Sequence, residues 1–397
     1  MNEVIIAGVG MTRWGKWNDL TSVDLGVEAA RKALADSGLE WRNIQLLVSG
    51  ESRFAGTNGF LMGNVLAKEL GWSGIPALNI YNACSSGTYA VRIAQMHVAA
   101  GMCDAVLCVG YDKSPIGFFS PPYDRSWDYT DLDTQRLRLL GLTNPTIFAL
   151  HAMRRRELYG TTDTDLAKVK VKSSKHGVLN PYARYQREFT MEEIVNSPMV
   201  CSPLRLYEIA ATSDGAAAVV ICSQKLAKTL TSKPIILAGI SCTTPSYPEN
   251  EPALMWLSSD STYSRPIPEV NQQQTAALLA YEESGIGPED LSLAEVYDLS
   301  ANLELDWYEY IGLCAPGEAE ELLSEGATSL GGRIPVNPSG GVSAFGESVP
   351  AQSLAQMCEL VWQLRGEAGA RQVEGAKTAL AINMGLMGNI SCAILKR

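Results

Sequence analysis

The chain has 397 residues and a mass of 42.9 kDa, which is enough to bury a large core and suggests two domains or one large double domain. Its 32 basic and 43 acidic residues give a formal charge of −11, which argues against a nucleic-acid partner. Nine cysteines without CxxC or Cys/His spacing indicate reduced thiols rather than disulfides or a metal site. No apolar run reaches the length of a membrane span, and the first strand begins almost at once. We therefore expect a cytoplasmic protein that does not enter a membrane.

The first hundred residues alternate between strands and helices, as in α/β proteins. Apolar runs predict strands at residues 4–7, 44–48 and 105–109. Helical periodicity predicts an amphipathic helix at 25–38, and a glycine-rich segment at 56–63 precedes a second helix. Gly38 is a typical stop for the helix. A further apolar run through Ile80 predicts a strand that stops at Asn82.

Cys84 follows this strand in a turn of small residues, and a helical pattern begins directly after it. A cysteine at the first turn of a helix feels the positive end of the helix dipole, which lowers its pKa and favours the thiolate. The small neighbours would let an acyl group approach the sulfur. Cys84 is therefore a candidate nucleophile; the alternative is a small buried cysteine that fills a strand–helix junction.

Residues 111–207 interrupt the α/β pattern. Aromatic residues, prolines and charges crowd together at 118–131, and helices with a lysine cluster follow. We interpret the segment as an insertion. On their own, the lysines of this cluster are typical of a solvated helix face.

The second half of the chain repeats the first. KALADSGLEWRNIQLLVSGE (32–51) matches LAYEESGIGPEDLSLAEVYD (279–298), and the glycine turn and helix at 346–358 match those around Cys84. Such a duplication predicts two similar α/β halves packed around shared central helices. It also brings the turns before residues 84, 299, 347 and 384 close to one cavity.

Several long stretches together resemble the thiolase superfamily, most closely its branch of sterol-carrier and lipid-transfer thiolases. They are NACSSG (82–87), LNPYARY (179–185), 196–221, 295–318, NPSGG (337–341) and 363–376. The resemblance runs essentially end to end. It implies a thiolase-like α/β fold of two duplicated halves, layered α-β-α-β-α. The N-terminal half would comprise 1–110 and 208–232, the C-terminal half 233–397, and a loop domain covering the CoA site 111–207.

A thiolase, as the resemblance implies, uses a nucleophilic cysteine, a Gly-His-Pro histidine, a second cysteine in a Cys-x-Gly turn, and a His or Asn at the oxyanion hole. Cys84 matches the nucleophile, but Glu347 and Tyr297 stand where the two histidines belong. Asn383 or Met384 replaces the second cysteine. The neighbouring residues expected to line the site are Asp298, Gly346, Asn383 and Gly385. The histidines, His97, His151 and His176, fall on none of these positions and lack metal-ligand spacing.

These substitutions change the expected chemistry. A glutamate accepts a proton, but its negative charge raises the pKa of a nearby thiol, so thiolysis should be slow. Glutamate and tyrosine together supply an acceptor and a donor, which suits the aldolases of this branch. We therefore expect retro-aldol cleavage of a bulky, steroid-like 3-hydroxyacyl-CoA. The alternatives are a thiolase or acetyl-CoA acetyltransferase that uses Cys84, and a subunit that binds acyl-CoA or lipid without catalysis.

The resemblance also implies ligands and partners. Coenzyme A would enter as part of the substrate, with no bound cofactor and no metal, and Lys168, Lys172 and Lys175 are candidates for its phosphates. The chain would form a homodimer. A small OB-fold and zinc-ribbon subunit would close the acyl-CoA channel.

Overall fold

The computed structural model describes residues 3–52, 60–114, 143–230, 233–245 and 270–397. The strands in these ranges are β1 (Val4–Met11), β2 (Leu46–Gly50), β3 (Ala77–Ile80), β4 (Ala105–Lys113), β5 (Met199–Cys201), β6 (Leu204–Arg205), β7 (Asp214–Ser223), β8 (Ile235–Thr243), β9 (Leu293–Glu295), β10 (Thr378–Gly385) and β11 (Asn389–Lys396). The α-helices are α1 (Ser22–Ser37), α2 (Met62–Leu70), α3 (Ser86–Ala99), α5 (Asn144–Tyr159), α6 (Asp163–Gly177), α7 (Met191–Val195), α8 (Gln224–Ala227), α9 (Gln272–Ser284), α10 (Ala301–Tyr310), α11 (Ala319–Ser324), α12 (Gly341–Phe345) and α13 (Gln352–Arg365).

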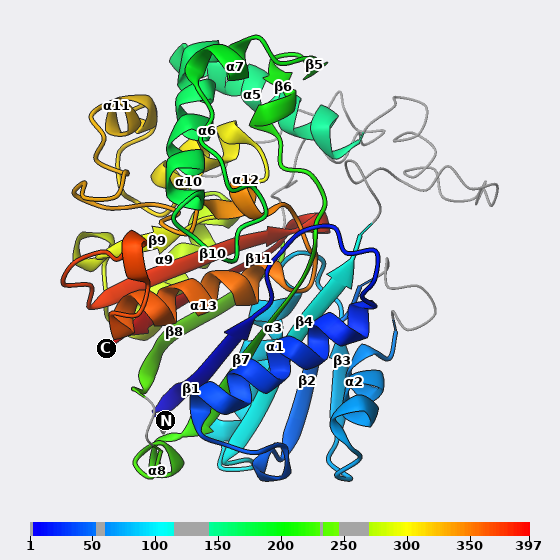
Figure 1. The fold of residues 1–397 in the computed structure, drawn as a ribbon. Coiled ribbons are helices and arrows are strands. Elements are labelled where there is room, and N and C mark those ends of the chain that lie inside the picture. The colour runs from blue at the N-terminus through cyan, green and yellow to red at the C-terminus, as the bar shows by residue number, and fades with distance from the viewer. Residues whose placement is uncertain (1–2, 53–59, 115–142, 231–232, 246–269) are drawn as a thin grey trace.

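Nine strands form one sheet in the order β3-β2-β4-β7-β1-β8-β11-β10-β9 (Figure 1). From its centre outward, β1-β7-β4-β2 on one side corresponds to β8-β11-β10-β9 on the other. The pairing directions agree as well: the first two pairs of each series are antiparallel and the third is parallel. The two series meet where β1 and β8 pair antiparallel, with Ile5 opposite Ile236. The expected duplication of an α/β unit is thus confirmed.

The helices α1 and α9 show the same correspondence in detail. Each ends at a glycine in the left-handed conformation, Gly38 with φ 75° and Gly285 with φ 66°. Each also packs so closely on its strand that only glycine fits there. A Cβ on Gly8 would lie 2.4 Å from a carbonyl oxygen of α1, and a Cβ on Gly239 would lie 2.5 Å from one of α9. The repeated sequence therefore builds the same strand–helix contact twice.

The core is arranged in layers. One hydrophobic cluster joins α3 and α13 to strands of both halves, so these two helices form a shared central layer. A second cluster places α1 and α2 on the outer face of the first half, and a third places α9 and α10 against β10 and β11. Figure 1 shows α13 running between the two halves of the sheet. The predicted α-β-α-β-α layering is confirmed.

The elements between β4 and β7 form the upper part of the molecule in Figure 1. Within it, α6 packs against α10, α11 and α12, so this part sits on the C-terminal half. The segment after α6 also reaches α13, because the ring of Tyr182 stacks on Trp362 with centroids 4.9 Å apart. β4 continues to Lys113, beyond the predicted boundary at 110, and the aromatic stretch 118–131 and residues 56–59 lie outside the described residues. The division into domains stays a prediction.

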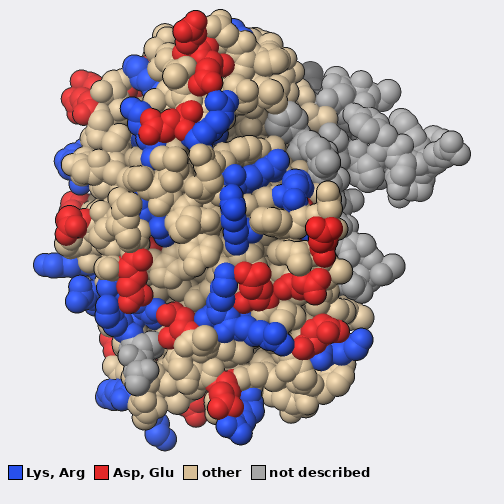
Figure 2. All heavy atoms as spheres, viewed as in Figure 1, with Lys and Arg blue, Asp and Glu red and all other residues tan. Residues whose placement is uncertain are grey.

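The surface carries both signs of charge. On the face shown in Figure 2, basic and acidic side chains are interspersed. Among the described residues, no helix is both long and apolar enough to cross a membrane. A cytoplasmic location stays a prediction.

Candidate active site

Cys84 lies in a strained turn between β3 and α3. The residue before it, Ala83, has φ 52°, a left-handed conformation that is rare outside glycine and is often found at functional sites. The residue after it, Ser85, donates its hydroxyl to the carbonyl oxygens of Asn389 at 2.9 Å and Asn383 at 3.3 Å. The nucleophile turn of the first half is thereby fastened to the β10–β11 hairpin of the second.

The hairpin approaches this turn through its backbone. A Cβ on Gly385 would lie 2.4 Å from the carbonyl oxygen of Asn82, so only glycine allows the contact. The Asn383 side chain instead donates to Gln356 of α13 at 3.1 Å. The expectation that the Asn383 side chain lines the site is therefore wrong, because alternate residues of a strand point to opposite faces. Met384 is the one that packs, like Cys84, against the hydrophobic cluster of the C-terminal half.

Hydrogen bonds to the backbone at and just before Tyr297 fix the position of this residue. Its carbonyl oxygen accepts a hydrogen bond from the indole of Trp307 at 2.8 Å. The preceding Val296 N–H donates to the Asn337 side chain at 2.8 Å, and the amide of Asn337 in turn donates to Glu304 at 2.9 Å. Asn337 itself has φ 52°, so a second strained residue supports the site.

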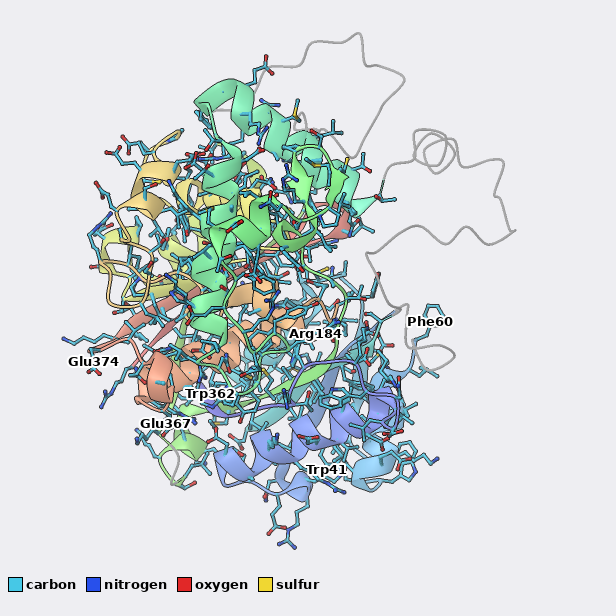
Figure 3. All side chains as sticks on the ribbon, turned by 45° about the horizontal axis from the view of Figure 1, so that its top comes forward. Trp41, Phe60, Arg184, Trp362, Glu367 and Glu374 are labelled. Atoms are coloured by element: carbon cyan, nitrogen blue, oxygen red, sulfur yellow. The ribbon has the colours of Figure 1, made fainter. Side chains whose placement is uncertain are left out.

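Glu347 lies between the halves on an extended segment after α12. Its N–H donates to Ala211 at 2.8 Å, and its carbonyl oxygen accepts from Ser213 at 2.7 Å. Arg184 contacts the residue between these two partners: its guanidinium donates to the carbonyl oxygen of Thr212 at 2.5 Å. Figure 3 shows Arg184 near its centre. These bonds aim the Glu347 side chain at the Cys84 turn.

The side chains of Cys84, Tyr297 and Glu347 meet, as the sequence analysis predicts. Burial raises the pKa of the Glu347 carboxyl to about 8, although the nearby thiol and phenol lower it. Those two groups act at close range, yet neither carboxylate oxygen has a partner with standard hydrogen-bond geometry among the described residues. A fully buried carboxyl without partners of standard geometry suits a group that exchanges protons with a ligand.

The thiol itself is not activated. Burial and the charge of Glu347 raise the pKa of Cys84 well above its ordinary value, and the contact with Tyr297 offsets only part of this. The expectation that the start of α3 acidifies Cys84 is therefore wrong for this structure. The Cys84 side chain is only partly buried. Burial and the same two neighbours also raise the pKa of Tyr297, so it stays a hydrogen-bond donor.

Asp112 is a member of this site that sequence reasoning missed. It is fully buried at the end of β4 and accepts hydrogen bonds from Ser52 and Ser114, each at 2.7 Å. Burial raises the pKa of Asp112 to about 6, and its negative charge raises the pKa of Glu347. An aspartate directly after the apolar run of β4 was the signal that could have identified it.

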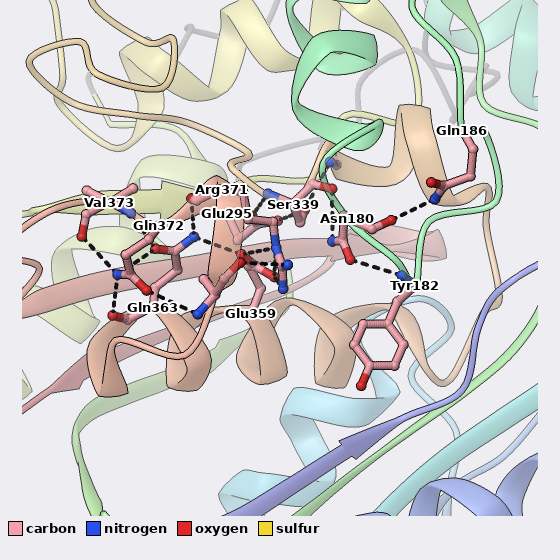
Figure 4. Close-up of polar contacts among 12 residues, drawn as sticks. Asn180, Tyr182, Gln186, Glu295, Ser339, Glu359, Gln363, Arg371, Gln372 and Val373 are labelled. Carbon is pink, nitrogen blue, oxygen red and sulfur yellow. Dashed lines mark hydrogen bonds and ion pairs between the residues drawn. The ribbon is translucent and has the colours of Figure 1, made fainter.

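Asp298 and the NPSGG segment support the site without lining it. The Asp298 carboxylate accepts from the N–H groups of Val342 at 2.6 Å and Ser343 at 3.3 Å, at the start of α12. Figure 4 shows Ser339 held between Glu295, which accepts from its N–H and hydroxyl, and Asn180, which donates to its carbonyl. The predicted site-lining role of Asp298 is thus corrected to positioning. Gly346, with φ 77°, gives the turn that leads from α12 into Glu347.

The predicted phosphate-binding lysines lie in different environments. Lys172 is buried and pairs with Glu304 at 2.6 Å, so its prediction as a CoA-phosphate ligand is wrong. Lys168 pairs with Asp165 at 3.1 Å, and Lys175 is exposed. Lys170, a member of the same predicted lysine cluster, is buried beside α12 and donates to Ser343.

The histidines take part in packing. His176 is buried, and its two ring nitrogens contact the Asn337 carbonyl at 2.9 Å and the Leu330 N–H at 3.1 Å. Burial lowers the pKa of His151 to about 4 and of His176 to about 3, so both are neutral. His97 contacts the carbonyl of Ile93 in its own helix. No cluster of three potential metal ligands occurs within the described ranges.

Known proteins are similar to this chain in sequence and in fold. The family model described as thiolase, N-terminal domain, matches residues 4–225, and the one described as thiolase C-terminal domain-like matches residues 257–397. Sterol carrier protein 2 of Rattus norvegicus is 35% identical over 97% of this chain and 70% of its own length. An acetyl-CoA acetyltransferase of Methanothermobacter thermautotrophicus is 32% identical over 98% of this chain and 97% of its own. The solved structure of an Ltp2-ChsH2(DUF35) aldolase aligns with a TM-score of 0.83 and 27% identity, covering 99% and 97% of the two chains.

Lys172→Met should lower the free energy of unfolding by about 3–5 kcal/mol, because it leaves the Glu304 carboxylate buried without its cation. Lys175→Met, on the exposed face of the same helix, is the matched control and should change it by less than about 0.5 kcal/mol. Urea unfolding measures both. A stable Lys172→Met variant with weakened CoA binding would restore the phosphate role.

Asp112→Asn should lower the pKa of Glu347, because it removes a neighbouring negative charge. The shift should be roughly half a unit to one unit, visible as a move of the activity profile to lower pH. Glu51→Gln is the control: Glu51 is another buried carboxyl, whose pKa burial raises to about 7, but it does not act on Glu347. Identical profiles for Asp112→Asn and wild type would show that the two carboxyls are independent.

Proposed function

We propose that this chain, which belongs to the thiolase family, cleaves a carbon–carbon bond of a 3-hydroxyacyl-CoA by a retro-aldol reaction. As a thiolase-superfamily enzyme it acts on acyl-CoA. The observation that carries the proposal is a buried carboxyl, Glu347, at the place of the family's activating histidine and in contact with Cys84 and Tyr297.

The reaction balances with the groups of the chain. The Glu347 carboxylate takes the proton of the 3-hydroxyl, and the C2–C3 bond breaks to release an aldehyde or ketone. Its electron pair moves into the thioester as an enolate. The Tyr297 hydroxyl and backbone N–H groups at the start of α3 donate to the enolate oxygen, as in an oxyanion hole. The proton on Glu347 then returns to C2, which yields the shorter acyl-CoA and restores the carboxylate.

The electrostatics favour this route over an acyl-enzyme. A thiolate on Cys84 would form beside a carboxylate, in a buried place that already raises the pKa of the thiol. An imidazole would become a cation and stabilise the thiolate, whereas a carboxyl becomes neutral at best. The retro-aldol route needs no thiolate. The similar solved structure, which is named an aldolase, supports the same choice.

A thiolase or acetyl-CoA acetyltransferase reaction is the second candidate. Two observations favour it: Cys84 stays partly exposed in a strained turn, and the similar Methanothermobacter protein is named an acetyl-CoA acetyltransferase. Glu347 would then have to deprotonate Cys84. A subunit that binds acyl-CoA or lipid without catalysis is the third, and it would turn over neither substrate type.

The acyl chain, the CoA site and the partner are proposals of the same kind. A bulky, steroid-like acyl group is supported by relatives named sterol carrier protein 2. CoA would belong to the substrate and enter between the core and residues 111–207, with Lys168 and Lys175 near its phosphates. The DUF35 protein named together with Ltp2 in the similar aldolase supports a small partner subunit.

We further propose a homodimer formed through β3, which is an edge strand of the sheet in the described part of the chain, because such an edge offers backbone groups to a second copy. Leu78 and Tyr81 are exposed on or next to this strand, by 36% and 47%. Light scattering should give twice the chain mass of 42.9 kDa, and Leu78→Lys should give the single mass. Met102→Lys, an exposed methionine beyond α3, should remain dimeric. A wild-type monomer, or a dimer that survives Leu78→Lys, would contradict the proposal.

The two chemistries respond oppositely to two substitutions. In a retro-aldol enzyme Cys84→Ala should keep substantial activity, whereas Glu347→Gln should lose about 10²–10⁴-fold of kcat/KM with the loss of its base. The wild-type kcat/KM should rise with pH to a plateau above about 8, because the base works ionised. Product analysis by mass on 3-hydroxyacyl-CoA and 3-oxoacyl-CoA, with and without the partner, measures this.

Cys103→Ala, another partly buried cysteine, is the control for Cys84→Ala. An acyl adduct on Cys84 in intact-mass spectra during productive turnover would establish the thiolase route instead. If neither substrate is turned over with the partner present, the function that remains is binding of acyl-CoA or lipid without catalysis.

A further inference from the structure

A pocket of about 170 Å³ is lined by residues of α6, of α12 and of the segments 185–189 and 206–211. Ala211 lines it, and the carbonyl of Ala211 accepts the N–H of Glu347 at 2.8 Å. Ser343, on the short helix that leads into Glu347, lines it as well. The pocket therefore adjoins the candidate active site.

Three aromatic residues line the pocket, and its one charged lining residue is a lysine. Tyr185, Phe189 and Tyr207 line it together with Lys170. The ammonium of Lys170 lies 5.0 Å from the centroid of the Phe189 ring and 5.5 Å from that of Tyr185. Aromatic faces attract a cation but do not neutralise it.

Lys170 is 6% exposed and lacks a full set of partners. Its ammonium donates to the carbonyl of Ser343 at 2.8 Å and to the Ser343 hydroxyl at 2.9 Å. An ammonium has three donors, and the third finds no acceptor among the described residues. No carboxylate in the described ranges lies within ion-pair distance either, in contrast to Lys172 with its Glu304.

The charges around Lys170 do not neutralise its ammonium group. Asp298 favours the ammonium from a distance, but its oxygens already accept two N–H groups of α12, and Arg187 opposes it. Burial lowers the pKa of Lys170 to about 8, so at pH 7 most of it is charged. A buried charge without a counter-charge is costly, and a bound anion would remove that cost.

We propose that this pocket binds a carboxylate at the far end of the substrate's acyl chain, with Lys170 as its counter-ion. The inference rests on the proposed action on acyl-CoA and narrows it to chains that carry a second acidic group. The pantetheine arm of CoA carries neutral amides and a hydroxyl, which need no counter-ion, and the three phosphate groups of CoA carry more negative charge than one buried lysine can neutralise. A volume of about 170 Å³ leaves room for a carboxylate and a few methylene groups.

Binding of two matched esters tests this. In the Glu347→Gln background, which slows turnover about 10²–10⁴-fold, calorimetry compares 3-hydroxyadipyl-CoA with 3-hydroxyhexanoyl-CoA, which has six acyl carbons and no carboxylate. The first should bind about 10- to 100-fold more tightly, the effect of one charge-assisted contact. Adding Lys170→Met should abolish the difference by weakening only the adipyl ester. Lys225→Met, at an exposed lysine of α8 that does not line the pocket, should leave the difference unchanged.

Equal affinity of the two esters for the Glu347→Gln variant would overturn the proposal. This comparison keeps Lys170 in place and therefore does not depend on whether Lys170→Met folds. So would an equal loss of both esters in a folded Lys170→Met variant, which would assign Lys170 to the CoA part. In either case the proposed function stands if wild-type enzyme cleaves the hexanoyl ester. If neither ester binds or reacts, the proposal for this pocket fails, and turnover of a bulkier 3-hydroxyacyl-CoA by the wild-type enzyme decides whether the proposed function fails as well.

Discussion

The contact of a buried carboxyl with a thiol and a phenol is the constraint on which the chemistry of this protein depends. Glu347 is fully buried, its oxygens lack standard hydrogen-bond partners among the described residues, and its pKa lies near 8. In that state it holds a proton for most of the time at neutral pH and can still release it. The same carboxyl disfavours a thiolate on Cys84. Glu347 thus serves as the acid–base group and also keeps the thiol of Cys84 protonated, which makes it a poor nucleophile.

The duplicated fold brings these groups together. Cys84 comes from the turn after β3 in the first half, whereas Tyr297 and Glu347 come from the turns after β9 and α12 in the second. The turns are joined by backbone contacts that leave no room for side chains, as at Gly385. Left-handed backbone at Ala83 adds strain that the surrounding packing must hold. The site therefore exists only where both halves are folded against each other.

Sequence reasoning predicted the fold because a long repeat and several ordered motifs define it redundantly. It also predicted that Cys84, Tyr297 and Glu347 would meet, since equivalent turns of a duplicated unit converge. It failed where the answer depends on three-dimensional surroundings. The dipole of α3 was visible in the sequence, but the burial that outweighs it at Cys84 was not. Likewise, helical spacing does not distinguish the ion-paired Lys172 from the exposed Lys175.

Strand alternation shows the same limit at a single residue. Asn383 was expected in a turn but lies within β10, and its side chain points to α13 because the register of the strand sets its face. Asp112 was missed for a related reason: its effect on Glu347 passes through space between β4 and a turn far away in the chain. Such couplings become visible only when the packing is known.

The most direct measurement of the central claim is the titration of Glu347 itself. Carbon-13 NMR of protein labelled at the glutamate carboxyl carbons, with the Glu347 signal identified by its absence in Glu347→Gln, follows the proton on this one group. The account predicts a midpoint near pH 8. A midpoint near the ordinary glutamate value of 4.5 would mean a permanently ionised carboxylate, and it would contradict the role of Glu347 as the acid–base group of the site.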